Sequence, residues 1–370
     1  MTYLAADTPS FLACHRLAEA TLPPPRLRGL LEATGGDPEA ALACRVGLTP
    51  RQVERLERAA HTSPNPRTLE QALTWGVQAL LVTSPEYPAD LRHFDDSPPI
   101  LFVRGKLPER PGLAIVGSRR ATGYGKGQAV RFAQAFVEAG FTVISGGAAG
   151  IDTAAHRGTL EVGGTTVAVV ACGLDYIYPA ENRQLFEQLV VQGGAIVSEF
   201  PVGTKPEPWR FPARNRIIAA LSQVTVVIES PEQSGALITA RNAAEYGRDV
   251  WVVPGPVDTG RSRGGHQLIQ DGAYLADSPA DILEALVVAP RAVNLTLPLE
   301  VEERQPAPRP LPELPPDEAA LLAQLSGSPV GLDDAAEAAG LAPAQALVAA
   351  TLLEMKGLVK RQPGNHFIRS

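Results

Sequence analysis

From Leu113 onwards the sequence alternates between short, almost wholly apolar runs and longer stretches with helical periodicity. The apolar runs are LAIVGS, FTVISG, TTVAVVACG, AIVSEF, VTVVIES and DVWVVPG, and stretches such as KGQAVRFAQAFVEAG and SGALITARNAAEYG lie between them. Apolar strands of this length that alternate with helices are typical of a parallel sheet covered on both faces. The pattern therefore predicts a doubly wound α/β fold.

The rest of the chain divides around this fold. Residues 1–84 read as a small helical, helix-hairpin-like domain; in LTPRQVERLERAA, Thr49 is placed to cap a helix that begins at Pro50. Residues 85–288 then form the Rossmann-like domain with its lead-in segment. The eight prolines of residues 289–316 indicate an extended linker, and residues 317–370 have the three helices and two-stranded wing of a winged-helix domain.

The net charge of −7 argues against a polycation that coats nucleic acid, although it leaves room for a local basic cleft. No segment has the run of about 20 apolar residues that a membrane span needs. The three cysteines lie far apart and share no metal-ligand spacing with the six histidines, so we expect reduced thiols and no metal site. We therefore expect a cytoplasmic protein without a membrane contact.

Glycine-rich loops follow several of the predicted strands, and such loops bind phosphate when their N–H groups open a helix. Three have this form: GSRRATGYGKG at residues 117–127, SGGAAGIDTAAH at 145–156 and ESPEQSGALITA at 229–240. The first lacks the GxGxxG spacing, and the second strand ends without the acid that binds a ribose, which argues against NAD. We expect no cofactor, and three anion-ready helix starts along one sheet edge suit a chain of phosphates.

The stretch FPARNRIIAALS, residues 211–222, places two more cations at a helix start. If the helix begins near Pro212, Arg214 and Arg216 lie in its first turn, where the helix dipole disfavours a cation by about 0.3–1 kcal/mol. An external anion would explain this placement, and we expect neither Arg119 nor Arg214 to fill the core. Basic residues also cluster nearby: residues 104–131 hold seven against one acid, and residues 205–216 hold four against one. The same loops contain four aromatic residues, which we expect either to stack on bases or to pack in the core: Tyr176, Tyr178, Trp209 and Phe211.

No catalytic constellation accompanies these loops. Asp152 and His156 are spaced to meet across one helical turn, for which a structural hydrogen bond is the favoured interpretation over acid–base chemistry. Two other functions compete with the binding of a phosphate chain. A nucleotide phosphoribohydrolase of Rossmann-like fold carries PGGxGTxxE where this chain has SGALITA without an acid, and a pure protein-interaction scaffold would not need arginine-rich clefts.

The ordered motifs resemble those of DprA, the DNA-processing family of bacterial natural transformation. AIVGSRRATGYG, SGGAAGIDTAAHRGTL, TTVAVVACGLDYIYPAEN, IVSEFPVGTKP, FPARNRIIAALS, SGALITARNAAEYGRDVWVVPG and LIQDGA carry the resemblance over residues 84–288. It implies a single-stranded DNA-binding protein that is not an enzyme. Such a protein protects incoming DNA, helps to load RecA onto strands covered by single-strand-binding protein, and forms a homodimer through the Rossmann-like domain.

The resemblance also implies which residues contact DNA. Ala180 stands where many relatives have lysine, so Arg183 or Lys205 is expected to replace that phosphate contact. In GGHQLIQDGAYL the dimer contact is expected near Leu268 and Ile269, which otherwise pack on the sheet. The winged-helix segment APAQALVAATLLEM has no lysine or arginine, so we expect it not to bind DNA. The full DNA-binding set is Gly117, Ser118, Arg119, Thr122, Gly146, Gly147, Ala148, Gly150, Arg183, Lys205, Phe211, Arg214, Asn215, Arg216, Ser234, Gly235 and Thr239.

Overall fold

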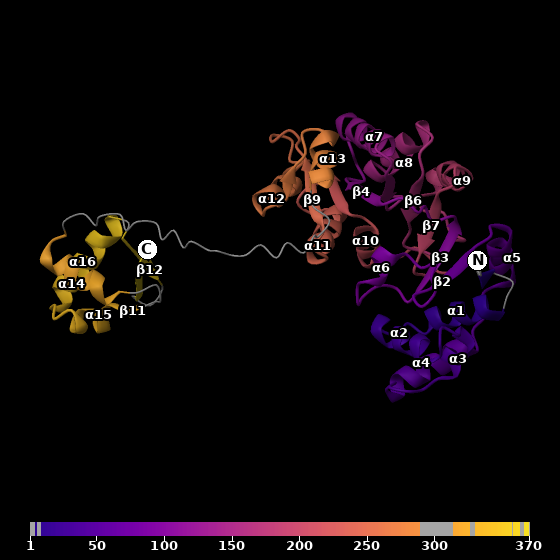
Figure 1. Ribbon diagram of the computed structural model, residues 1–370, viewed down its shortest axis with the longest axis horizontal. Coiled ribbons are helices and arrows are strands. Elements are labelled where there is room, and N and C mark those ends of the chain that lie inside the picture. Colours follow the sequence, from indigo (N-terminus) through magenta and orange to yellow (C-terminus); the bar gives the residue numbers. More distant parts are fainter. Residues whose placement is uncertain are drawn as a thin grey trace. The chain divides into compact units, whose positions relative to one another are not determined.

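The computed structural model describes residues 4–5, 9–288, 314–325, 330–356, 358–362 and 366–369 of the chain. The chain forms two compact units, residues 1–291 and residues 292–370 (Figure 1). In the parts of the chain that are described, no helix combines the length and apolar character needed to cross a membrane.

A sheet of ten described strands forms the centre of the first unit, in the order β1-β2-β3-β7-β6-β5-β4-β8-β9-β10. The strands from β7 to β10 in this order run parallel, whereas β1, β2 and β3 pair antiparallel. All six predicted apolar runs form strands. The bounds are β1 Leu4–Ala5, β2 Gln78–Leu81, β3 Ile100–Gly105, β4 Gly112–Gly117, β5 Thr142–Ser145, β6 Thr166–Val169, β7 Ala195–Ser198, β8 Val224–Ile228, β9 Asp249–Val253 and β10 Tyr274–Leu275.

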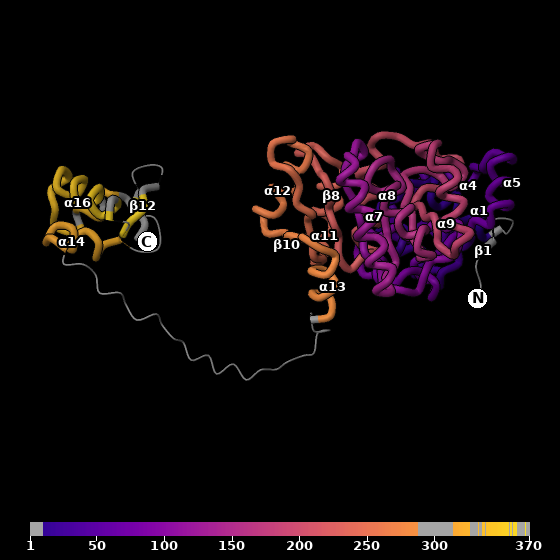
Figure 2. Tube along the Cα trace, turned by 90° about the horizontal axis from the view of Figure 1, so that it is seen from above, coloured from indigo at the N-terminus to yellow at the C-terminus, as the bar shows by residue number. Residues whose placement is uncertain are grey.

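Helices cover both faces of the parallel strands, which confirms the doubly wound fold. On one face, α7 (Gly123–Glu138) and α8 (Ile151–Glu161) lie side by side, and α13 (Pro279–Val288) packs with them (Figure 2). On the other, α10 (Arg210–Ala220) and α11 (Gly235–Glu245) pack together. Alternate residues of β4 point to the two cores, because Leu113 and Ile115 join one apolar cluster whereas Ala114 and Val116 join the other. The remaining helices of this part are α9 (Arg183–Val191) and α12 (Arg263–Gln270).

The amino-terminal helices belong to the same compact unit as the sheet, so the expected boundary at residue 84 does not separate two bodies. Phe11 and Phe102 meet edge to face, and both lie in the apolar cluster that also contains residues of α10 and α11. The predicted cap is present, since Thr49 and Gln52 form a capping box at α4. These helices are α1 (Pro9–Glu19), α2 (Pro24–Ala33), α3 (Pro38–Ala43), α4 (Pro50–Ala60), α5 (Pro66–Thr74) and α6 (Ala89–Arg92).

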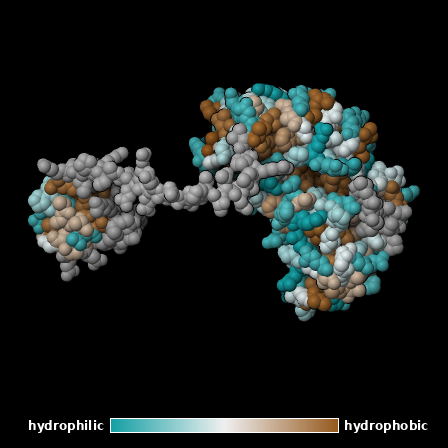
Figure 3. All heavy atoms as spheres, viewed as in Figure 1, coloured by the Kyte–Doolittle hydropathy of each residue, from teal (hydrophilic) through white to brown (hydrophobic). Residues whose placement is uncertain are grey.

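The order of the strands creates a crevice at one edge of the sheet. From β4 the chain moves outward through β5, β6 and β7, and α10 then carries it back to β8 on the other side of β4. In open α/β sheets, ligands bind where the order reverses, outside the carboxyl ends of the strands. Here that point lies between the ends of β4 and β8. On the face of the first unit that is seen in Figure 3, hydrophilic residues cover much of the surface, with hydrophobic ones scattered among them.

The second unit has the predicted winged-helix architecture. Its helices α14 (Pro316–Gln324), α15 (Leu332–Ala338) and α16 (Pro343–Met355) pack on a sheet of three described strands, in the order β11-β13-β12. Leu321, Leu353 and Phe367 are buried at its centre. On α16 the side chains of Leu347 and Val348 are exposed. The strands are β11 Val330–Gly331, β12 Val359–Gln362 and β13 His366–Arg369.

Candidate functional site

A cavity of about 920 Å³ lies at the carboxyl ends of β4 and β8, where the strand order reverses. The loop after β4, the beginnings of α10 and α11, and the loop after β9 form its walls. Four arginines and one carboxylate are among its lining residues: Arg119, Arg120, Arg214, Arg261 and Asp152. A protein with a net charge of −7 thus concentrates positive charge in this cavity.

Arg119 is exposed and lies against an aromatic wall. Its guanidinium carbon is 4.7 Å from the centre of the Phe211 ring, and the Phe211 and Tyr178 ring centres are 5.4 Å apart. Both rings line the cavity, and Tyr178 is 43 % exposed. The stacked arginine keeps its donors available to an anion, while the rings offer flat apolar surface to a base.

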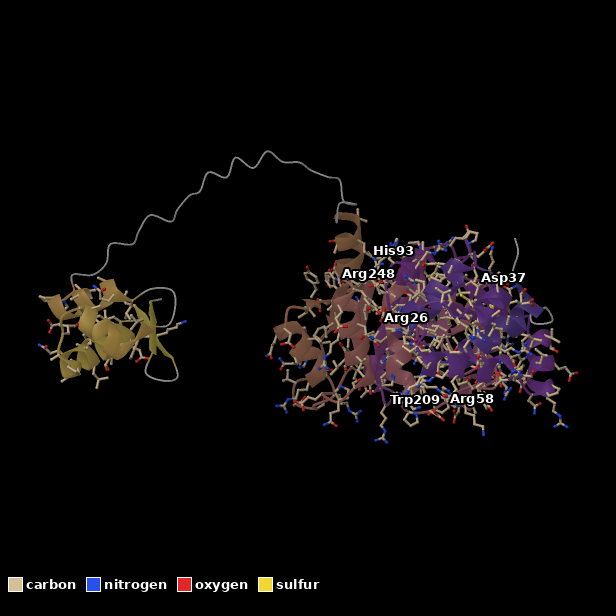
Figure 4. All side chains as sticks on the ribbon, turned by 90° about the horizontal axis from the view of Figure 1, so that it is seen from below. Arg26, Asp37, Arg58, His93, Trp209 and Arg248 are labelled. Carbon is tan, nitrogen blue, oxygen red and sulfur yellow. The ribbon has the colours of Figure 1, made fainter. Side chains whose placement is uncertain are left out.

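Trp209 lies beside the cavity without lining it. Its side chain is 61 % exposed and lies at the outer edge of the unit (Figure 4). The indole N–H donates to Glu207 at 2.7 Å, and the guanidinium of Arg210 stacks on both Trp209 and Phe200. Trp209 is therefore neither a core residue nor part of the aromatic wall.

Arg214 is buried, contrary to the expectation that it stays outside the core. The helix α10 begins at Arg210, so Arg214 is its fifth residue and lies beyond the first turn. Its side chain is 3 % exposed, and Nη1 donates to the carbonyl of Gly146 at 2.7 Å. Burial lowers the pKa of Arg214 to about 10, against the opposing influence of the Asp152 carboxylate. Arg214 therefore forms the floor of the cavity and supports the loop after β5.

Arg216, the other cation of the pair, does not line the cavity. Its guanidinium forms two hydrogen bonds of 2.7 Å with the carboxylate of Glu199, and Nε donates to the carbonyl of Asp96 at 3.0 Å. The expectation that both arginines face an external anion is therefore corrected for Arg216. A carboxylate of the protein already neutralises this cation, whose contacts join α10 to the segments after β7 and α6.

Two helix starts that we expected to bind phosphate contain carboxylates of the protein itself. Glu229 accepts hydrogen bonds from the backbone N–H and hydroxyl of Thr122, the residue that caps α7. A Cβ at Gly125 would lie 2.0 Å from Glu229 Oε2, which explains the glycine there. Asp152 accepts from the N–H of Ala148 at 3.2 Å at the start of α8. Burial raises the pKa of Asp152, and Arg214 opposes this shift.

The predicted hydrogen bond between Asp152 and His156 is wrong, since the partner of the His156 side chain is the Thr166 hydroxyl. The Thr166 hydroxyl donates to the carbonyl of Val143, so it accepts from His156 Nδ1 at 2.7 Å. Burial lowers the pKa of His156 to about 3, and the imidazole is therefore neutral. Among the described residues, no group of three or more His, Cys, Asp or Glu side chains is arranged to hold a metal ion.

The structure brings together ten of the predicted DNA-binding residues and separates the others. Those that line the cavity are Gly117, Ser118, Arg119, Ala148, Phe211, Arg214, Asn215, Ser234, Gly235 and Thr239. Four support its walls without lining it: Thr122, Gly146, Gly147 and Gly150. Arg183, Lys205 and Arg216 do not line the cavity.

Arg261 is the main cavity residue that we did not predict. It lies in GPVDTGRSR, the loop between β9 and α12, and Thr259 and Gly260 of the same loop also line the cavity. A signal was present in the sequence, because this loop follows a predicted strand and is rich in glycine. In a parallel sheet it must reach the same edge as the other strand-end loops.

Comparison with known proteins identifies the family of this chain. The family of DNA recombination-mediator protein A matches residues 78–287, which is more than half of the chain. The chain belongs to this family. The DprA winged-helix domain also matches residues 305–365.

The match extends over most of the length of several relatives. Protein Smf of Synechocystis is 38 % identical over 81 % of this chain and 82 % of that protein. The X-ray structure of DprA from Streptococcus pneumoniae has a TM-score of 0.60 and 34 % identity, and the match covers 73 % of this chain and 95 % of that one. A structure describing the single-stranded DNA binding mode of DprA from Helicobacter pylori has a TM-score of 0.51 and 28 % identity, covering 58 % and 96 %.

Proposed function

We propose that this DprA protein binds single-stranded DNA in the cavity at the ends of β4 and β8. The observation that supports this proposal most strongly is the group of four arginines in that cavity, in a chain whose net charge is negative. Phosphates contact Arg119 and the open rim, and bases stack on the wall of Tyr178 and Phe211. Because these contacts are with phosphates and ring faces, the binding has little sequence preference.

Titration of a fluorescent oligothymidine, followed by anisotropy at several salt concentrations, tests this proposal. We expect the logarithm of the affinity to fall with log[salt] by about 0.7 for each phosphate neutralised. Arg119→Ala should weaken binding by about tenfold or more, as expected for the loss of a charge-assisted contact. Arg110→Ala is the matched control, because the exposed Arg110 precedes β4 and Arg119 follows it. Salt-independent binding, or equal losses in the two variants, would reject the site.

In the cell, this binding protects incoming DNA and helps to load RecA onto strands covered by single-strand-binding protein, which places the protein in the cytoplasm. The test is the ATPase activity of RecA on DNA that single-strand-binding protein has coated beforehand. The wild-type protein should shorten the lag before ATP hydrolysis, and Arg119→Ala should not. If the wild-type protein binds DNA but leaves the lag unchanged, the RecA-loading role is rejected and the proposed DNA binding is not.

We also propose a homodimer through α12 and the adjacent edge of the sheet. Leu268 and Ile269 are half-buried against the larger apolar cluster, while Tyr274 and Leu275 of the edge strand β10 are 52 % and 49 % exposed. An unprotected apolar edge strand favours pairing with a second chain. Light scattering should find a folded monomer for Leu275→Glu and for Ile269→Glu. A folded Leu275→Glu dimer would exclude this edge.

A nucleotide phosphoribohydrolase is the competing function. It needs an acid at the start of α11, where the described lining residues are Gln233, Ser234, Gly235 and Ala236. Incubation with nucleoside monophosphates, followed by chromatography for released base, separates the two functions. Release that Asp152→Asn abolishes would favour the enzyme, because Asp152 is the carboxylate that lines the cavity.

A further inference from the structure

We infer that Arg261 binds a phosphate of the DNA. The loop between β9 and α12, which contains Arg261, then adds a basic wall to the cavity beside the loop after β4. This inference rests on the proposed binding of single-stranded DNA and adds a residue to it. The motif resemblance did not point to Arg261, and the loop reaches the cavity from a part of the sequence more than 40 residues beyond Arg214.

The loop is held in shape by its own contacts. At its base, the Tyr124 hydroxyl of α7 donates to the carbonyl of Pro254 at 2.8 Å. A Cβ at Gly255 would lie 2.2 Å from the hydroxyl oxygen of Ser262, so the two ends of the loop are in close contact, and Ser262 is 2 % exposed. Within the loop, the N–H of Arg261 donates to the Thr259 hydroxyl at 3.4 Å. A loop closed in this way presents Arg261 with little left to order upon binding.

The guanidinium of Arg261 is held by one hydrogen bond and by one longer ion pair, and most of its N–H groups stay open to the cavity. Nη1 donates to the backbone carbonyl of Arg120 at 3.2 Å, and among the described residues no other hydrogen bond of this side chain is found. Its nearest carboxylate oxygen, Glu229 Oε1, is 3.8 Å away. That carboxylate already accepts hydrogen bonds from Thr122. Since the side chain is 53 % exposed, its remaining N–H groups can reach a phosphate in the cavity.

The hydrogen bond from Arg261 to the carbonyl of Arg120 joins two basic loops at the rim of the cavity. Arg119 and Arg120 lie on the loop after β4, so the contact brings the cations of two different strand-end loops to one rim. Cations on separate loops along a rim match successive phosphates of a strand, so the ligand that we infer for this rim is a phosphodiester backbone and not a mononucleotide.

Arg263 provides a matched control two residues away. It is 73 % exposed and pairs with Glu232 at 3.0 Å, and it does not line the cavity. Replacing either arginine with glutamine removes the same charge from neighbouring surface positions, so a general effect of net charge would be equal in the two variants. A specific contact would be lost only in Arg261→Gln.

The experiment is the oligothymidine titration on the full chain with Arg261→Gln, Arg261→Lys, Arg263→Gln and Arg119→Ala. We expect Arg261→Gln to weaken binding about fivefold or more and to make the salt dependence shallower by about 0.7, the value for one phosphate. Arg261→Lys should recover part of the loss, and Arg263→Gln should bind like the wild type. Circular dichroism melting confirms that the variants are folded.

Wild-type binding by Arg261→Gln, or equal losses in Arg261→Gln and Arg263→Gln, would overturn the inference. If Arg119→Ala weakens binding in the same series, that failure leaves the proposed function standing. If the wild type binds without salt dependence, the proposed function itself fails.

Discussion

Replacing Arg214 should destabilise the protein as well as weaken DNA binding, because this cation lies beside a buried carboxylate. Arg214 is 3 % exposed and Asp152 is 8 % exposed. Both side chains lie against Gly146: a Cβ at that glycine would be 2.8 Å from the Arg214 guanidinium and 2.7 Å from the Asp152 carboxylate. Arg214→Met keeps most of the side-chain length but leaves Asp152 without its compensating charge. Removing one partner of a direct buried ion pair costs about 3–5 kcal/mol of unfolding free energy. Arg214 and Asp152 interact through space without such a direct contact, so we expect a loss near or below the lower end of that range.

A double-mutant cycle isolates the electrostatic part of this cost. Asp152→Asn leaves Arg214 buried without its carboxylate, whereas the double variant Asp152→Asn/Arg214→Met contains neither charge. We therefore expect the double variant to lose less stability than the two single losses added together, by about 1.5 kcal/mol or more. Urea unfolding followed by circular dichroism at pH 7 measures all four proteins.

The pH dependence supplies a second check with a defined sign. Burial raises the pKa of Asp152, and Arg214→Met removes the largest influence that opposes this shift, leaving only the hydrogen bonds from Ala148 and Ser145 and the charge of Arg119. A carboxyl whose pKa is higher in the folded than in the unfolded state binds more protons when folded, so it costs stability as the pH rises above its unfolded value of about 4. The difference between the wild type and Arg214→Met should therefore shrink on acidification from pH 8 to pH 5. Additive losses, together with a difference that does not change with pH, would refute this account.

Three further outcomes are expected. Burial lowers the pKa of His156 in the folded protein to about 3, below the unfolded value of about 6.5. On acidification the unfolded state therefore binds this proton first, and the free energy of unfolding falls by about 1.4 kcal/mol per pH unit below about pH 6.5. Urea unfolding of His156→Gln between pH 5 and 7 should lack this slope. Arg216→Ala should lose about 1–3 kcal/mol because Glu199 is left unpaired, while oligothymidine affinity stays unchanged. A chain ended after residue 291 should keep the DNA affinity of the full chain, since α16 offers no basic side chain; a large loss in the same titration would assign DNA contacts to the winged helix.

The regular part of the fold was predictable because the sequence pattern determines it directly. Each apolar run became a strand, since a strand buried on both faces needs apolar residues at successive positions. The antiparallel strands β2 and β3 were missed. The stretches QALL and ILFVRG lie outside the strand–helix alternation. β3 pairs with β7 and β2 with β3, which extends the sheet toward the amino-terminal helices.

The cavity was only partly predictable, because charge clusters along the sequence do not stay together in space. Of the seven basic residues in 104–131, Arg119 and Arg120 line the cavity, whereas Arg104 stacks on Trp75 at 4.0 Å and Arg110 precedes β4. Arg261 comes from a segment with no such cluster. The topology of the sheet was the better guide, since it brings every strand-end loop to one edge whatever its composition.

Glycine-rich loops were the least specific signal, because a glycine is needed wherever two backbones approach closely, with or without a phosphate. A Cβ at Gly150 would lie 2.2 Å from the carbonyl oxygen of Ser118, so this glycine lets the loops after β4 and β5 pack against each other. Gly125 likewise makes room for Glu229 at the start of α7. The sequence alone does not distinguish such a glycine from one that approaches a ligand.

The carboxylates at two helix starts explain why the cavity suits a polymer better than a single nucleotide. A mononucleotide site at the first strand–helix turn uses the free N–H groups of the following helix, and here Glu229 already accepts from Thr122 at that position. Asp152 accepts from Ala148 at the start of the next helix. Anion binding is left mainly to arginine side chains on the rim, which bind phosphates without fixing a nucleotide in one register. Because such contacts would be repeated along a strand, we expect the affinity to grow with strand length and to be sensitive to salt.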